Sequence, residues 1–406
     1  MRYPLDYLKK TVGGWLYLED SLLIDVVMAG YVANLLNTDP LWLLIIAPPS
    51  HTKTELLRAF DGFDGAYFLS SLTPSTLVSG IKPKKGVPEP SLLPQLNGKT
   101  LFLKDFTTVL SMRSENQQEI LAQLREVYDG QYSKVFGNGK AINWQGHVGL
   151  IGACTPVYDR HYGVIGSLGD RFILYRASGG SPEKMGLQAQ RIVGKEVQMR
   201  KEIQHAVHRF AGQFRDRKDF HVETEDSVKR KIVALTSFVA MARCPVERGW
   251  NDGRVLYQPL PEGTPRLVKQ LMQLGIGLAL VKGKGEIDGG VYEVLKKVGT
   301  DLITTQRLAV LEHLWTEGSI ESLNTTIKTK DIADAVNIPA RTTVILLEDL
   351  MMTGCLNRQR SGHGETSPYL WQINIETTQL LTKSEVFEQK FSTSAPEAVA
   401  VAKGSI

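Results

Sequence analysis

Cysteine is scarce in this sequence, and it shows no metal-binding spacing. The chain of 406 residues has three cysteines, Cys154, Cys244 and Cys355, which lie far apart. Zinc sites usually pair their ligands about two to four residues apart, and disulfide-stapled secreted domains are rich in cysteine. The pattern therefore argues against both and favours a reducing, cytoplasmic compartment.

Long apolar runs and an excess of one charge are absent too. No apolar run approaches the ~18 residues that a membrane-spanning helix needs, and the N-terminus lacks the apolar core of a signal peptide. We therefore expect no membrane partner. The formal net charge is only +4, so any nucleic-acid surface must be a local patch. With 42% hydrophobic and 22% charged residues, the composition is that of an ordinary soluble protein, long enough for two or three domains.

What is present begins with residues 41–54. The apolar run Leu41 to Ile46 predicts a strand buried on both faces, and Lys53-Thr54 open a predicted helix. A strand, a loop and a helix N-terminus form the layout of a phosphate-binding loop, whose usual pattern is G-x-x-x-x-G-K-[ST]. Ala47 and Thr52 stand where the two glycines belong. The alternative is an ordinary strand–turn–helix joint with an exposed lysine and threonine.

In a phosphate-binding loop the side chains of this segment would have separate roles. Lys53 would reach the β- and γ-phosphates of ATP, and the Thr54 hydroxyl would bind Mg²⁺. The predicted nucleotide-binding residues are Ala47, Pro48, Pro49, Ser50, His51, Thr52, Lys53 and Thr54.

A second apolar strand, within residues 99–109, ends in a carboxylate. Asp105 follows Thr-Leu-Phe-Leu-Lys, as in a Walker B arrangement, where an acid at the end of a strand holds Mg²⁺ or orients the attacking water. Only one acid is present, because Lys104 occupies the position beside it. An aspartate after a strand is also common for structural reasons, and the sequence does not decide between metal ligand and general base.

Two basic segments of the same region are predicted to project from the core. The Gly137-Asn138-Gly139 turn predicts a β-hairpin flanked by Lys134 and Lys140. Residues 70–95 are rich in proline and carry a basic tip, Lys82, Lys84 and Lys85. These lysines are candidates for DNA contacts. Ordinary surface lysines are the alternative.

Further along, polar residues follow or precede predicted core elements. A buried strand at 147–153 ends in Cys154-Thr155-Pro156, and Arg171 comes directly before another apolar strand. Residues 178–186 are predicted to be a linker, and the chain then turns helical with a basic polar face. Thr264-Pro265-Arg266 opens a further helix, since proline is well tolerated in a first turn.

The last predicted unit is a helix–turn–helix followed by a two-stranded hairpin, which is typical of a winged helix. Its second helix would carry Arg341, Thr342 and Thr343, and the hairpin Arg358, Arg360 and His363. Winged helices bind DNA or proteins, and both alternatives stay open. We place domain boundaries at 1–180, 181–300 and 301–378, and we expect residues 379–406 to be a polar, disordered tail.

The order of these motifs resembles the AAA+ core of the MCM (minichromosome maintenance) replicative helicases, from about residue 20 to the winged helix. That family also replaces the second glycine of its phosphate loop. Leu72-Thr73 and residues 91–96 resemble the ends of its insertion between the Walker motifs. Ala153 to Pro156 resembles its first sensor, Leu168 to Phe172 its arginine finger, and Thr264 to Leu267 its second sensor.

The resemblance implies a fold and a function. The fold would be an α/β AAA+ P-loop core with a helical lid and a C-terminal winged helix. The function would be an ATP-driven DNA helicase or translocase acting in DNA replication as a ring, a homo-oligomer that is most simply a hexamer, with ATP and Mg²⁺ as cofactors. Only about 40 residues precede the phosphate loop, so we expect a compact, divergent relative of this family, from a bacterial mobile element or phage, without the family's N-terminal collar.

The site residues that the resemblance implies act in cis and in trans. Lys53, Thr54 and Asp105 would act with Mg²⁺, and Thr155 would position the attacking water. Arg171 would come from the neighbouring subunit, and Arg266 would sense the γ-phosphate from either side. The hairpin lysines and the loop lysines would line the pore and grip single-stranded DNA.

Two other functions remain possible from the sequence. The missing glycines and the lone acid favour a nucleotide-gated DNA-binding initiator or regulator that hydrolyses ATP slowly. The second alternative is a helicase loader or remodelling ATPase, whose winged helix docks proteins.

Overall fold

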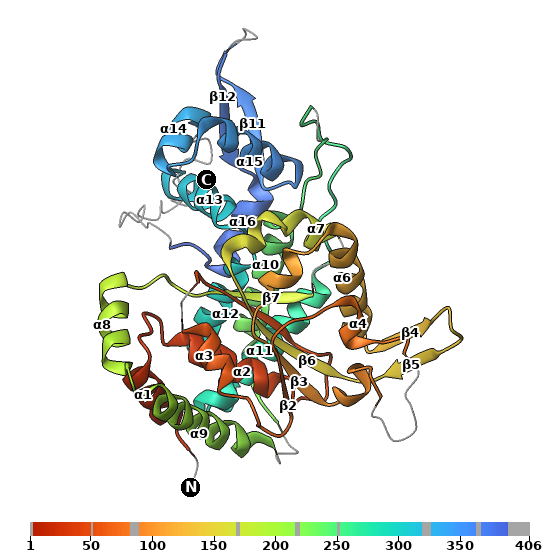
Figure 1. The fold of residues 1–406 in the computed structure, drawn as a ribbon. Coiled ribbons are helices and arrows are strands. Elements are labelled where there is room, and N and C mark those ends of the chain that lie inside the picture. The colour runs from red at the N-terminus through yellow and green to blue at the C-terminus, as the bar shows by residue number, and fades with distance from the viewer. Residues whose placement is uncertain are drawn as a thin grey trace, which may run out of the picture.

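The computed structural model describes residues 3–49, 52–81, 89–167, 171–215, 220–249, 252–318, 326–362 and 367–388. An α/β region forms the centre, a set of helices lies beside and below it, and a smaller C-terminal unit stands above (Figure 1). Among the described residues, no helix combines the length and the apolarity needed to cross a bilayer.

A five-stranded parallel sheet organises the α/β region. Its order is β2-β3-β6-β1-β7, and the strands are β1 (Trp42–Ile46), β2 (Ala66–Leu69), β3 (Lys99–Leu103), β6 (Val148–Cys154) and β7 (Phe172–Arg176). Every residue of β1 and β6 is buried, as near-continuous apolar runs in a parallel sheet predict. The predicted strand at 41–46 is therefore confirmed. The sheet is compatible with a P-loop-like core.

Helix α2 (Leu22–Ala33) fills the space between this sheet and α11 (Pro265–Lys282). All of its residues after Leu22 are buried, because β1, β6 and α11 surround it. At the closest approach of the two helices, a Cβ added to Gly277 would lie 2.3 Å from the backbone oxygen of Ala29. Only glycine fits there without moving one helix away from the other.

The predicted hairpin is present and packs against α6 (Ser114–Tyr128). Strands β4 (Gln131–Val135) and β5 (Ala141–Gln145) pair antiparallel across the predicted turn. The helices of this region are α3 (Lys53–Arg58), α4 (Pro74–Leu77), α5 (Thr107–Leu110), α6 and α7 (Tyr162–Ser167), with 3-10 turns at Leu93–Gln95 and Pro156–Arg160.

Residues 182–301 are mainly helical. The helices are α8 (Pro182–Ile192), α9 (Glu196–Arg215), α10 (Asp226–Ala242), α11 and α12 (Gly289–Asp301), with a short parallel pair of β8 (Glu223–Thr224) and β9 (Glu286–Ile287). The linker expected at 178–186 is wrong in its second half, because α8 starts inside it. Ser181 caps that helix by accepting a hydrogen bond from the Lys184 N–H, and Pro182 occupies its first turn.

The C-terminal unit contains the predicted helix pair and hairpin. Its elements are α13 (Thr305–Glu317), β10 (Ile327–Lys328), α14 (Thr329–Ala335), α15 (Ala340–Met352), β11 (Leu356–Arg360), β12 (Tyr369–Ile373) and α16 (Ile375–Ser384). The strands form an antiparallel sheet of order β10-β12-β11. Asn337, in the turn between α14 and α15, has φ 53°, a left-handed conformation that asparagine tolerates.

The expected disordered tail from residue 379 is wrong at its start. Helix α16 runs through that boundary, buries Leu381 completely and packs against α10. The Tyr292 hydroxyl also donates a hydrogen bond to the backbone oxygen of Ser384. The apolar residues of α16 pack against a helix that is distant in the sequence, so the local sequence does not indicate their burial. Residues 389–406 lie outside the described part of the chain.

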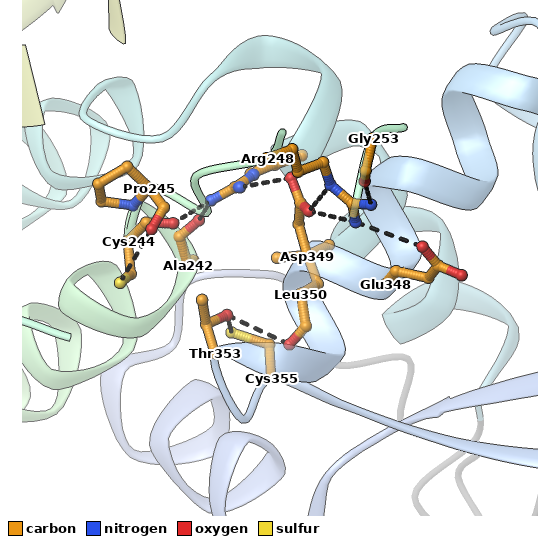
Figure 2. Close-up of polar contacts among 11 residues, drawn as sticks. Ala242, Cys244, Pro245, Arg248, Gly253, Glu348, Asp349, Leu350, Thr353 and Cys355 are labelled. Atoms are coloured by element: carbon orange, nitrogen blue, oxygen red, sulfur yellow. Dashed lines mark hydrogen bonds and ion pairs between the residues drawn. The ribbon is translucent and has the colours of Figure 1, made fainter. Parts of the chain in front are cut away.

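An ion-pair cluster fastens α15 to the helical region (Figure 2). Asp349 on α15 accepts from Arg248 at 2.8 Å and from Arg307 at 3.1 Å. Arg307 also donates to the backbone oxygens of Ala242 at 3.0 Å and Cys244 at 2.7 Å, at the end of α10. Arg307 and Asp349 are 5% and 8% exposed, so the cluster satisfies charges that water barely reaches.

We expect Asp349→Ala to destabilise the C-terminal unit by roughly 3–5 kcal/mol, because it leaves a buried guanidinium without its carboxylate. Glu348→Ala is the matched control, since the Glu348 side chain is one-third exposed and its pair with Arg248 should contribute less than about 1 kcal/mol. Urea unfolding followed by tryptophan fluorescence, to which Trp315 and Trp371 of the C-terminal unit contribute, measures the difference. Equal midpoints for the two variants would contradict this account.

Candidate nucleotide-binding site

Lys53 lies at the carboxyl edge of the sheet, where β1 leads into α3. Its ammonium donates to the backbone oxygens of Ala47 at 2.6 Å and Pro48 at 2.8 Å, and the residue is only 6% exposed. Burial lowers the pKa of this ammonium, while Asp105 and Cys154 favour its charged form and partly offset the shift. The lysine is therefore held inside the loop. An ordinary strand–turn–helix joint would instead leave it projecting into solvent.

The rest of the predicted loop surrounds Lys53 only in part. Ala47 is buried, Pro48 and Pro49 are exposed, and Thr52 and Thr54 are half-buried. Ser50 and His51 lie outside the described residues.

Asp105 follows β3 at the same edge of the sheet. Its Oδ1 accepts a hydrogen bond from the Thr107 N–H at 2.9 Å, which fixes the carboxylate just beyond the strand. Thr107 Oγ1 in turn accepts from the Thr155 N–H at 3.1 Å and lies 3.3 Å from Thr155 Oγ1. The adjacent strands β3 and β6 thus bring Asp105 and Thr155 together. Lys53 reaches the same edge through Ala47, because the Ala47 backbone oxygen accepts from the lysine and the Ala47 N–H donates to the Cys154 oxygen at 3.1 Å.

Thr107 was missed by reasoning from sequence. The one signal for it was the run Asp-Phe-Thr directly after a strand, which is typical of an aspartate that bonds the backbone two residues on.

Arg176, at the end of β7, is a second residue that the sequence did not single out. Its guanidinium makes a bidentate pair with Asp159 at 2.9 and 2.7 Å, and its backbone N–H donates to Asp301 Oδ2 at 2.8 Å. Lys297 also donates to Asp301, at 2.8 Å. Burial raises the pKa of Asp301, against the opposing effect of Lys297 and Arg176. These contacts fasten α12 to the edge of the sheet that carries Lys53.

A small cavity adjoins the loop. It is lined in part by Asp20, Ala47, Lys53 and Gly180, and its volume is about 20 Å³. Ligand sites usually have ~300 Å³ or more. A nucleotide would therefore need Lys53 to leave its two carbonyl partners and the segments around Asp20 and Gly180 to move apart.

Arg171 lies at the opposite edge of the sheet. It precedes β7, whose first residue, Phe172, pairs with Trp42 at the start of β1, whereas Lys53 follows the end of β1. Five strand residues separate the two edges, about 17 Å at ~3.3 Å per residue. The guanidinium pairs with Asp129 at 3.3 Å and lies 5.6 Å from the ring centre of Tyr128. Residues 168–170 of the finger motif lie outside the described chain.

Arg266 lies on the same side as Arg171. One helical turn after it on α11, Gln270 donates to the backbone oxygen of Arg171 at 2.7 Å and to the Tyr128 hydroxyl at 3.2 Å. Arg266 itself pairs with Glu262 beside a cavity of about 290 Å³. The structure thus groups the two predicted arginines with each other and keeps both away from Lys53 of their own chain.

The predicted hairpin lysines are engaged. Lys140 donates to the backbone oxygens of Ser79 and Ile81, both at 2.9 Å, and to Glu89 at 2.6 Å, and its side chain is only 10% exposed. It fastens the base of the proline-rich segment and is not presented to DNA in this conformation. Lys134 pairs with Glu119 at 3.0 Å. The tip residues Lys82, Lys84 and Lys85 lie outside the described residues.

In the C-terminal unit the predicted DNA contacts differ in exposure. Arg341 is exposed at the start of α15, whereas Thr343 is fully buried and bonds back to the preceding turn, so it cannot contact DNA. Arg358 lies 4.3 Å from the ring centre of Tyr369 and Arg360 lies 5.2 Å from it, on the outer strand of the hairpin. His363 lies outside the described chain.

Comparison of the chain with models of known protein families found no match, and comparison with curated proteins found none.

Proposed function

We propose that this chain is an ATP-driven DNA motor of the MCM-like AAA+ type, which works as a ring with ATP bound between protomers. The observation that carries the proposal is that Lys53, Asp105 and Thr155 all follow the ends of adjacent strands at the carboxyl edge of a parallel sheet, where such sheets bind their ligands. Lys53 contributes positive charge, Asp105 a carboxylate, and Thr155 a hydroxyl.

Each of these groups has a task in phosphoryl transfer to water. Lys53 would leave its carbonyl partners and bind the β- and γ-phosphate oxygens. Thr155 would orient the water that attacks the γ-phosphorus, with Asp105 on the adjacent strand. Thr54 and Asp105 offer the hard oxygen ligands that Mg²⁺ prefers, and the ion would neutralise phosphate charge.

The arginines at the other edge support a ring. Arg171 and Arg266 cannot reach the phosphate loop of their own protomer, since the depth of the sheet lies between. A neighbour that places its loop against this edge would receive both. An arginine finger of this kind stabilises charge on the transferring phosphoryl group by roughly 10³–10⁵-fold in rate.

This arrangement predicts complementation between two inactive variants. Arg171→Ala should bind ATP nearly normally and hydrolyse it hardly at all, because the missing finger serves the neighbour's site. Mixed with Lys53→Ala protein, it should regain part of the wild-type turnover, since a mixed interface can pair an intact loop with an intact finger. Steady-state phosphate release from mixtures of different ratios measures this.

Asp129→Asn is the matched control, because it removes the partner of Arg171 and keeps the arginine. If Arg171 only stabilised the fold through this pair, Asp129→Asn and Arg171→Ala would behave alike. Absence of complementation in subunits shown to co-assemble would count decisively against catalysis in trans.

We infer that the C-terminal unit is a winged helix, with α15 as the recognition helix and β11–β12 as the wing. Arg341, Arg358 and Arg360 would contact duplex DNA, while the hairpin β4–β5 and the loop of Lys82, Lys84 and Lys85 would contact a single strand in the pore. Lys140 would have to leave its present partners to do so.

One observation favours the alternative of a loader or remodelling ATPase that docks proteins. On α15, Val344 is 37% exposed and Ile345 is 39% exposed, so the face that would enter a DNA groove is partly apolar. Another observation favours the nucleotide-gated regulator, which would hydrolyse ATP slowly: Lys104, and not a second acid, stands beside Asp105.

A further inference from the structure

A groove between α1 (Leu5–Trp15) and α9 carries side chains that the ATP site does not use. Tyr3, Tyr7 and Trp15 line it from α1 and the residues before it, Lys10 lies on the same side, and Lys201 and Arg209 line it from α9. Its volume is about 760 Å³. In Figure 1 the two helices run side by side at the lower left. We call this the α1–α9 groove.

Helical periodicity places these residues in rows. On α1, Tyr7, Thr11 and Gly14 follow the spacing i, i+4, i+7, and on α9, Lys201, His205 and Arg209 follow i, i+4, i+8. Nothing lies within 4 Å of a Cβ added to Gly14, so the groove stays open there. From Tyr3 to Gly14 the groove is roughly 17 Å long at 1.5 Å per residue, which is the length of a few nucleotides.

The charge of the groove is positive. Lys10, Lys201 and Arg209 are exposed and face a single lining carboxylate, Glu202. That carboxylate already accepts a hydrogen bond from the Trp15 indole N–H at 2.7 Å. Lys201 and Arg209 lie about two helical turns apart on α9, so they can bind separate phosphates of one strand, which carries one negative charge per nucleotide.

The aromatic lining of the groove contains one exposed ring, that of Tyr7, whereas Trp15 is half-buried. The Tyr7 side chain is 55% exposed, while its neighbour Tyr3 is 8% exposed and supports it edge-on at 4.9 Å between ring centres. The Arg209 guanidinium lies 4.7 Å from the Tyr3 ring centre, so its position is set by a cation–π contact. An exposed ring held by a buried one offers a stacking surface for a base.

We propose that the α1–α9 groove binds single-stranded nucleic acid, with bases stacked on Tyr7 and Trp15 and phosphates held by Lys10, Lys201 and Arg209. Paired bases cannot stack on side chains in this way, so a duplex is excluded. The site stands independently of ATP hydrolysis, although Arg200 of α9 pairs with Glu55 of α3, the helix that Lys53 begins, at 3.1 Å.

The test is fluorescence anisotropy of a labelled 20-nucleotide oligo(dT) with the full-length chain, without ATP, across a range of salt concentrations. Tyr7→Ala should weaken binding by about tenfold, within the range of one stacked base, and Tyr7→Phe should not. Lys201→Ala/Arg209→Ala should also weaken it and reduce the slope of log K against log salt by about 1.4, or ~0.7 per lost phosphate contact. The control Lys229→Ala/Arg230→Ala removes the same charge from α10 and should change neither quantity.

A second measurement locates the strand. Oligonucleotides carrying 5-iododeoxyuridine should crosslink to Tyr7 or Trp15 on irradiation, as mapped by mass spectrometry. Unchanged binding in both groove variants, or crosslinks only elsewhere, would overturn the proposal. If the double variant alone weakens binding, the groove attracts any polyanion, an acidic protein segment included, and the stacking role is wrong. Because ATP turnover of the same variants is measured separately, failure here leaves the proposed motor function unaffected.

Discussion

Replacing Lys53 by alanine is expected to reduce ATP turnover by about 10²- to 10³-fold, the effect of removing one group that stabilises charge in the transition state. No other described cation contacts the loop oxygens as Lys53 does, with its ammonium within 2.8 Å of both Ala47 O and Pro48 O. Phosphate release by the purified variant, together with nucleotide binding by a fluorescent ATP analogue, measures the loss.

The fold should survive this change. The variant leaves the backbone oxygens of Ala47 and Pro48 without the lysine as donor, but water can enter the loop and bind them. We expect each lost hydrogen bond to lower the free energy of unfolding by roughly 1 kcal/mol. Lys104→Ala, beside Asp105, is the matched control and should keep both turnover and stability. Wild-type turnover by Lys53→Ala protein would remove the phosphate-loop assignment.

The second large effect is expected for Asp105→Asn, which should stop hydrolysis far more completely than it weakens ATP binding. The amide has the shape of the carboxylate and its oxygen can still accept from the Thr107 N–H, so the strand end keeps its geometry. It loses the negative charge that a metal ligand or a general base requires. Single-turnover hydrolysis and nucleotide affinity separate the two effects.

No second acid stands beside Asp105 to take its place, because that position is Lys104. The loss of turnover should therefore be large. A fall of less than about tenfold, roughly 1.4 kcal/mol of barrier, would mean that the catalytic carboxylate lies elsewhere in the chain.

Elements with a strong local pattern could be predicted from the sequence. The apolar run at 41–46 became β1, and the Gly-Asn-Gly turn joins β4 and β5. In each case the signal is contained in neighbouring residues, through apolar runs or turn chemistry. The placing of Asp105 and Thr155 at one edge also followed from the sequence, since parallel strands end on the same side.

Features that depend on distant partners could not be predicted. Lys140 was predicted to be exposed as a DNA contact, with an ordinary surface lysine as the alternative, yet its acceptors lie about 50–60 residues away in the chain. Helix α16 looked like a polar tail because its partner, α10, precedes it by more than a hundred residues. Arg176 and Asp301 likewise meet only once α12 packs on β7.

The most direct test of the ATP-driven motor is steady-state ATP hydrolysis by the full-length chain with and without single-stranded DNA, with particle mass measured in parallel. The account predicts Mg²⁺-dependent turnover that DNA stimulates, in particles of several subunits that assemble with ATP. Slow turnover that DNA does not stimulate, with ATP-dependent DNA binding retained, would select the nucleotide-gated regulator, and failure to bind any DNA would select the loader. Phosphate release no greater than that of Lys53→Ala would contradict an ATPase altogether.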